Sequence, residues 1–296
     1  MPATLFDSTL QRLRAAYADA QERRAVAVYL LEEALGLRGG RLYTCEDSEL
    51  SNTDRQLWQQ IVERVERGEP IQHVLGYAYF MGRRFEVSPA VLIPRPETAN
   101  LVTAALGLAE RLRQESGRPR VKVVDAGSGS GCIAVSMALA DGDADVVGVD
   151  VSAEALAVAR RNAASLGAAV SFRHGDMLQW LDESVAMDES LLTPPDATGL
   201  WVANPPYIHP REAADMEERV LAHEPHRALF APAGDPVVFY RAVAAGARRC
   251  GAGAVACEIN PLFISETAAV FQENEYGAIS VNADCYSKKR VLLAEK

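Results

Sequence analysis

The sequence lacks closely spaced pairs of cysteines, which argues against a disulfide-stabilised protein and against a zinc site. Five cysteines occur, and they form neither a CxxC pair nor a zinc-binding spacing: Cys45, Cys132, Cys250, Cys257 and Cys285. An odd number of cysteines without such spacing is typical of reduced thiols in a cytosolic protein rather than of a disulfide-stabilised one. We therefore expect buried free cysteines and no metal site.

Long apolar runs and an excess of basic residues are also missing. No run reaches the length that spans a bilayer, and the N-terminal residues lack a basic stretch followed by an apolar one. The 40 Asp and Glu residues outnumber the 30 Lys and Arg, which gives a formal net charge of -10 and therefore repels a phosphate backbone. We expect a cytoplasmic monomer with no membrane association and no direct contact with nucleic acid.

Residues 1–73 show the periodicity of a small helical bundle. Apolar residues recur there at the three-to-four spacing that forms one face of an amphipathic helix. The clearest helix follows Ser51-Asn52-Thr53 and stops at Gly68, and we expect both Leu57 and Trp58 on its apolar face. This bundle is the first of three predicted parts and is expected to bind the substrate.

The second part, residues 74–96, reads as a hairpin that turns at Gly82 and links two domains, although an edge ribbon without any role is an alternative. In the third part, residues 97–296, apolar β-rich runs alternate with amphipathic helical stretches. This alternation predicts an α/β fold with a doubly wound, mostly parallel sheet of seven strands. Residues 284–289 are too few for a crossover helix, so the last strand is expected to be antiparallel.

A glycine-rich turn follows the first strand of this sheet, just after Asp125. It consists of Gly127, Ser128, Gly129, Ser130 and Gly131. Glycine is needed where a ligand approaches the backbone closely. A dinucleotide fingerprint would require glycine or alanine where this chain has Cys132, so the spacing more closely resembles the turn that binds S-adenosylmethionine. A dinucleotide site and a purely structural turn remain alternatives.

Three further residues lie where an adenosine ligand would be bound. Asp150 ends the next strand, where a carboxylate can accept hydrogen bonds from two ribose hydroxyls. Asp176 and Met177 follow the third strand, so Asp176 could accept a hydrogen bond from the adenine amino group while Met177 packs on the ring. For Asp176 the alternative is a helix N-cap.

The sequence Asn204-Pro205-Pro206-Tyr207 stands at the C-terminal end of the fourth strand, where open parallel sheets bind ligands. An amide nitrogen is a poor nucleophile, and these residues could orient one by accepting its two hydrogens on the Asn204 side-chain oxygen and the Pro205 carbonyl. Two prolines stiffen that carbonyl, and Tyr207 could cover the amide and exclude water. The alternative is a plain proline turn.

Four stretches together resemble the HemK/PrmC family of peptide chain release factor N5-glutamine methyltransferases: LIPRPET (92–98), DAGSGSGCIA (125–134), NPPYI (204–208) and EPHRALF (224–230). The resemblance implies a Rossmann-like class I methyltransferase domain after an N-terminal helical bundle. It also implies that residues 127–131, Asp150, Met177 and Asn204 contact S-adenosyl-L-methionine, and that Asn204 to Tyr207 hold the glutamine.

By this resemblance, the partner is the Gly-Gly-Gln (GGQ) loop of a release factor, and the product is glutamine methylated on its side-chain amide nitrogen, N5. The sister activity on a ribosomal-protein glutamine is an alternative, and a dinucleotide-binding oxidoreductase is a more distant one. The sequence departs from the family pattern at Ala99, at Asp235-Pro236 and at Asn260, where glycine is usual. These departures lie outside the Asn-Pro-Pro-Tyr sequence.

Overall fold

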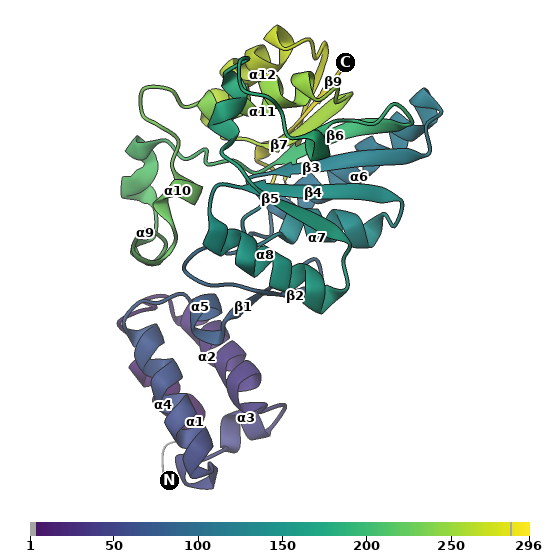
Figure 1. The fold of residues 1–296 in the computed structure, drawn as a ribbon. Coiled ribbons are helices and arrows are strands. Elements are labelled where there is room, and N and C mark those ends of the chain that lie inside the picture. Colours follow the sequence, from purple (N-terminus) through teal and green to yellow (C-terminus); the bar gives the residue numbers. More distant parts are fainter. Residues whose placement is uncertain (1–3, 285) are drawn as a thin grey trace. The chain divides into compact units, whose positions relative to one another are not determined.

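The computed structural model describes residues 4–284 and 286–296, which form two compact units (Figure 1). The helical unit contains the residues up to Tyr77 together with Glu217–His223. The sheet unit contains Ala78–Met216 and Glu224–Lys296. A short segment from the middle of the sheet unit's sequence therefore belongs to the N-terminal helices.

The helical unit is built from short and medium helices around one apolar core. Its elements are α1 (Leu5–Arg12), α2 (Ala20–Leu35), α3 (Arg41–Thr44), η1 (Asp47–Glu49), α4 (Asn52–Glu66), α5 (Ile71–Leu75) and α9 (Glu218–His223). On α9, the Arg219 guanidinium lies 4.7 Å from the Tyr17 ring centroid and donates to Glu22 over 2.7 Å. These contacts join α9 to the N-terminal helices.

Helix α4 begins at Asn52, inside the Ser51-Asn52-Thr53 stretch that it was expected to follow. The Ser51 hydroxyl accepts a hydrogen bond from the Asp54 amide over 3.1 Å, as an N-cap does. Trp58 is buried with later residues of the same face, but Leu57 is 44% exposed, so the expectation for Leu57 was wrong. Trp58 begins an i, i+3, i+4, i+7 series with the buried residues that follow, whereas Leu57 lies about 100° around the helix from it.

The sheet unit holds seven strands in the order β5-β4-β3-β6-β7-β9-β8. Their bounds are β3 (Arg120–Ala126), β4 (Ala144–Asp150), β5 (Val170–His174), β6 (Ala197–Ala203), β7 (Ala254–Glu258), β8 (Ala278–Ala283) and β9 (Lys289–Glu295). Neighbours from β5 to β7 pair in parallel, and β9 is antiparallel to both β7 and β8. The predicted α/β class and antiparallel last strand are confirmed.

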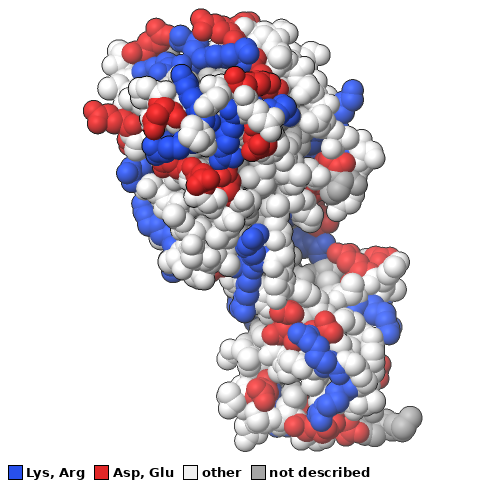
Figure 2. All heavy atoms as spheres, turned by 90° about the vertical axis from the view of Figure 1, so that its right-hand side faces the viewer, with Lys and Arg blue, Asp and Glu red and all other residues white. Residues whose placement is uncertain are grey.

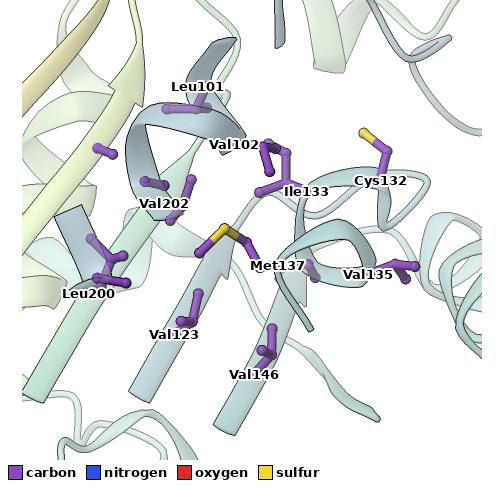
Figure 3. Close-up of a cluster of buried hydrophobic side chains, with 14 of the residues drawn as sticks. Leu101, Val102, Val123, Cys132, Ile133, Val135, Met137, Val146, Leu200 and Val202 are labelled. Atoms are coloured by element: carbon purple, nitrogen blue, oxygen red, sulfur yellow. The ribbon is translucent and has the colours of Figure 1, made fainter. Parts of the chain in front are cut away.

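Helices cover both faces of this sheet. They are α6 (Thr98–Ser116), α7 (Cys132–Ala140), α8 (Ala153–Leu166), α11 (Val238–Arg249) and α12 (Ile264–Glu273). The short elements are α10 (His226–Leu229), η2 (Met177–Leu181), η3 (Glu189–Leu191), η4 (Pro210–Asp215) and η5 (Pro261–Phe263). Figure 3 shows side chains of α6 and α7 beside those of β3, β4 and β6. Val123 packs in this cluster, and the next residue, Val124, packs on the opposite face with α11 and α12. Burial on both faces explains why central strands such as β6 and β7 are almost continuously apolar.

The hairpin consists of β1 (Tyr77–Phe80) and β2 (Arg83–Glu86). Phe80 and Phe85 are both buried in the core that α6 shares with the sheet, and their rings meet edge to face with centroids 6.0 Å apart. One buried aromatic side chain from each strand thus joins both β1 and β2 to the sheet unit's core.

Acidic and basic side chains lie side by side on the face shown in Figure 2. Ion pairs such as Arg111 with Glu295, 2.9 Å apart, and Arg120 with Asp196, 3.1 Å apart, join partners that are partly or largely exposed. Such pairs contribute only about 0–1 kcal/mol each to stability. Among the helices formed by the described residues, none combines the length and apolar character of a membrane span.

Candidate active site

The glycine-rich turn leaves β3 and is held by the end of β4. The amides of Gly127 and Ser128 donate to the Val149 carbonyl over 2.8 and 2.9 Å. Two of the turn's glycines have different reasons to be glycine. A Cβ on Gly131 would lie 3.0 Å from the Ala159 side chain of α8, whereas a Cβ on Gly129, where φ is +54°, would meet nothing within 4 Å. Gly131 therefore permits close packing, and Gly129 faces open space that a ligand can fill.

Asp150, at the end of β4, binds the turn itself. Its Oδ2 accepts a hydrogen bond from the Gly129 amide and its Oδ1 accepts one from the Ser152 amide, each over 2.8 Å. A carboxylate has about four acceptor positions, so each oxygen can still accept one further hydrogen bond. Asp150 thus fixes the backbone of Gly129 and keeps acceptors for a second partner.

A second carboxyl group, that of Asp125, is completely buried beneath the turn. Its Oδ2 accepts hydrogen bonds from the Ser128 hydroxyl over 2.7 Å and the Ala134 amide over 3.1 Å, and its Oδ1 has no partner. Burial raises the pKa of Asp125 to about 7, although the two hydrogen bonds oppose the rise. This carboxyl therefore titrates close to neutral pH.

The turn opens on a cavity of about 270 Å³ within the sheet unit. Its walls include these residues expected at the site: Gly127, Ser128, Gly129, Ser130, Asp150, Asp176, Met177, Asn204 and Pro206. Gly131, Pro205 and Tyr207 are expected site residues that lie outside this lining. Asp176 also caps η2, since its Oδ1 accepts a hydrogen bond from the Leu178 amide over 2.9 Å. Residues after three different strands are thereby brought to one cavity.

Asn204 follows β6, and its side chain is held from α6. Its Nδ2 donates to the Thr98 hydroxyl oxygen over 3.2 Å, and that hydroxyl donates to Glu258 Oε2 over 2.8 Å. The Tyr207 hydroxyl donates to the other oxygen, Glu258 Oε1, over 2.9 Å, and Arg290 donates to the Tyr207 hydroxyl over 3.2 Å. The Asn204 side-chain oxygen is left to face another partner.

Sequence reasoning missed several residues that build this site. Asn162 of α8 is 1% exposed and donates to the Ser130 carbonyl over 2.9 Å, while it exchanges hydrogen bonds with the backbone of Glu86. Glu258 and Arg290 come from β7 and β9. A buried polar residue on an otherwise apolar strand or helix face was the available signal, because such groups need designated partners.

Glu224 holds the segment before α6, which also lines the cavity. Its Oε2 accepts a hydrogen bond from the Ile93 amide over 3.0 Å, and its Oε1 forms an ion pair with Arg95 over 2.5 Å. The Glu224 side chain is 1% exposed. The LIPRPET and EPHRALF stretches, which are far apart in the sequence, are joined by this carboxylate.

The departure at Asn260 has structural consequences. Its Nδ2 donates to the Tyr207 carbonyl over 3.0 Å and to Glu212 Oε2 over 2.7 Å. Glycine, the usual residue here, could make neither side-chain bond. In this chain the segment after the Asn-Pro-Pro-Tyr sequence is consequently tied to the end of β7.

Comparisons with known proteins agree with this geometry. Residues 4–76 match the family described as PrmC N-terminal domain, and residues 118–192 match the family described as methyltransferase domain. A release factor glutamine methyltransferase of Bacteroides thetaiotaomicron is 36% identical over 278 residues, which cover 93% of this chain and 94% of that protein. One from Koribacter versatilis is 40% identical over 225 residues, which cover 76% of this chain and 74% of that protein.

The methyltransferase match contains the glycine-rich turn, so the dinucleotide alternative for that turn is withdrawn. Among solved structures, the hMettl16 catalytic domain in complex with MAT2A 3'UTR hairpin 1 is 10% identical, with a TM-score of 0.52, and the match covers 91% of this chain and 89% of that one. This likeness concerns the fold alone. Because the Bacteroides relative is matched over nearly its whole length, the resemblance noted in the sequence is confirmed, and the chain belongs to the family of release factor glutamine methyltransferases.

Proposed function

We propose that this protein transfers a methyl group from S-adenosylmethionine to the side-chain amide nitrogen of the glutamine in the Gly-Gly-Gln loop of a release factor. The observation that carries the proposal is the position of Asn204. Its side chain lines the same cavity as the glycine-rich turn, and its amide NH₂ group is already bound to Thr98. The free oxygen can accept a hydrogen bond from an amide.

The residues of the cavity fit S-adenosylmethionine. The open side of Gly129 leaves room for a ligand against the backbone, and Asp150 keeps acceptors for the ribose hydroxyls. Met177, the first residue of η2, lines the same cavity and can pack on the adenine. When bound, this cofactor supplies an electrophilic methyl group on a sulfonium.

The protein's own residues supply position rather than a strong base. An amide nitrogen becomes acidic only after it has been methylated, so no side chain must deprotonate it beforehand. We propose that the Asn204 oxygen and the Pro205 carbonyl accept the two amide hydrogens, which stabilises the positive charge that develops on nitrogen. Tyr207 would shield the amide, with its hydroxyl anchored on Glu258. We place the reaction in the cytoplasm, where release factors act.

Mass spectrometry tests the proposal directly. A purified release factor is incubated with the enzyme and S-adenosylmethionine and then digested. The peptide that contains the Gly-Gly-Gln loop is searched for a mass increase of about 14 daltons, which is the mass of one CH₂ group. We expect methylation on the glutamine, and a glutamine-to-alanine release factor should remain unmodified.

Two parallel reactions complete the experiment. Asn204→Ala should lower the catalytic rate by about 100- to 1000-fold with little change in cofactor affinity, as loss of one preorganised contact does. Ribosomal proteins are offered to the wild-type enzyme as the competing substrate. Methylation of a ribosomal-protein glutamine with none on the release factor would refute the proposed substrate.

A further inference from the structure

The carboxylate of Glu258 joins two groups of the Asn-Pro-Pro-Tyr sequence from beneath. Glu258 ends β7 and is 2% exposed. One of its oxygens accepts the hydroxyl hydrogen of Thr98, which in turn contacts Asn204, and the other accepts that of Tyr207. Its side-chain hydrogen bonds are thus directed to the site.

The Glu258 carboxylate determines which group donates and which accepts along the hydrogen bonds from Asn204 through Thr98 to Glu258. A threonine hydroxyl has one hydrogen, and here Thr98 donates it to Glu258. The Thr98 oxygen can then only accept, so Asn204 must turn its NH₂ group toward it. The Asn204 oxygen is thereby turned away from Thr98, which is the orientation that an incoming amide requires.

Several groups favour the carboxylate form of Glu258, which sets this direction. Burial, and to a smaller extent the charge of Glu97, raise the pKa of Glu258, while the two hydroxyl donors and the positive charge of Arg290 oppose that rise. Arg290 also donates to the Tyr207 hydroxyl, which leaves that hydroxyl's own hydrogen for Glu258. Each oxygen of the Glu258 carboxylate therefore accepts a hydrogen bond from one hydroxyl group, that of Thr98 or that of Tyr207.

We propose that Glu258 is a positioning residue for methyl transfer: through Thr98 it fixes which way the Asn204 amide faces, and directly it fixes the Tyr207 hydroxyl. This inference rests on the proposed role of Asn204 as the acceptor for the substrate amide. Glu258 touches neither substrate nor cofactor in this scheme. It acts by excluding the flipped Asn204 amide, whose NH₂ group would oppose the NH₂ group of glutamine.

Glu258→Gln tests the direction of the network with almost no change in shape. A glutamine side chain can donate as well as accept, so Thr98 is free to point its hydrogen at Asn204 and stabilise the flipped amide. We expect the turnover number to fall by about 10- to 100-fold, the usual effect of losing an outer contact that orients a reacting group. Cofactor affinity, measured by calorimetry, should change less than about twofold.

Thr98 offers a matched pair that keeps the test independent of folding at Glu258. Thr98→Val has the same shape but no hydroxyl and should lose turnover to a similar extent, whereas Thr98→Ser keeps the hydroxyl and should retain most of it. Thr198→Val removes another buried threonine hydroxyl at the start of β6, and serves as the control for burial alone. Equal turnover in Thr98→Val and Thr98→Ser would overturn the proposal.

A double-mutant cycle separates positioning from general stability. Once Asn204 is replaced by alanine, Glu258→Gln has no amide left to orient, so it should reduce the single-turnover rate much less than in the wild-type background. The same reduction in both backgrounds would show that Glu258 acts independently of Asn204. Turnover of Glu258→Gln within about twofold of wild type would refute the role outright.

The failure of this inference can be told from failure of the proposed function. If the wild-type enzyme does not methylate the release factor, the function is wrong. If the wild-type enzyme and Glu258→Gln methylate it equally well, only the positioning role is wrong.

Discussion

Replacing Asp125 with asparagine should change how the protein's stability depends on pH. Asp125 is completely buried, and burial raises its pKa from 3.8 to about 7. Asparagine has nearly the same shape and can accept the hydrogen bonds of Ser128 and Ala134 on its oxygen. It therefore mimics the protonated carboxyl at every pH.

The sign follows from the direction of the shift. The folded chain holds the Asp125 proton at pH values where the unfolded chain has lost it, so folding becomes less favourable as pH rises from about 4 to about 7. Each pH unit in this window corresponds to about 1.4 kcal/mol. Between pH 5 and pH 7, the wild-type protein should lose about 2 kcal/mol of stability relative to Asp125→Asn, because the slope falls as the folded-state carboxyl itself begins to ionise near pH 7.

Urea denaturation of both proteins at several pH values measures this difference. Comparison with Asp125→Asn removes the contributions of all other titrating groups, since these are common to both proteins. A difference in unfolding free energy that stays constant within about 0.5 kcal/mol from pH 5 to pH 8 would refute the argument.

The same carboxyl should link cofactor binding to proton release. A cationic ligand against the turn favours the ionised form of Asp125, so binding near pH 7 should release a fraction of a proton. Calorimetry in two buffers of different ionisation enthalpy should then give different apparent binding enthalpies for the wild-type protein. Asp125→Asn should give nearly the same enthalpy in both buffers.

Three further predictions follow from local geometry. Gly129→Val should fold but lose S-adenosylmethionine affinity in calorimetry, because its side chain enters open space that the ligand needs; unchanged affinity would place the cofactor elsewhere. Asn260→Gly removes three side-chain hydrogen bonds, one of them to the Tyr207 carbonyl, and should lower the unfolding free energy by about 2–3 kcal/mol in urea denaturation, a value that an unchanged midpoint would contradict. Gly148→Ala puts a Cβ 2.7 Å from the Phe172 ring and should destabilise the protein by about 1–3 kcal/mol in the same assay; a fully stable variant would show that the ring can move away.

The positions of the turn and of the Asn-Pro-Pro-Tyr sequence could be predicted because both follow strands that are recognisable locally. The run before Asp125 and the run before Asn204 are apolar and β-rich, and both became neighbouring parallel strands. The C-terminal ends of parallel strands meet at one edge of the sheet, so the two motifs necessarily approach each other. The fold class required no more than this periodicity.

Contacts between distant segments could not be predicted in this way. Thr98 is 106 residues from Asn204 and 160 residues from Glu258, yet one hydroxyl bonds to both. The lone glutamate in the apolar run of β7 indicated a buried polar group that needs partners, but nothing local identified Thr98 and Tyr207 as those partners. Likewise, α9 belongs to the helical unit although it follows the Asn-Pro-Pro-Tyr sequence along the chain.

The helical bundle, the mostly parallel sheet and the two motifs at its edge can be inferred from local sequence, because each depends on short-range periodicity and turn chemistry. The direction in which the Asn204 amide faces, and the carboxylates that hold the surrounding segments, depend instead on how the chain packs. Those choices depend on buried polar groups that must find partners wherever the packed chain brings them. Glu258 can orient Asn204 and hold the Tyr207 hydroxyl only because folding brings Thr98 and Tyr207 within hydrogen-bond distance of its carboxylate.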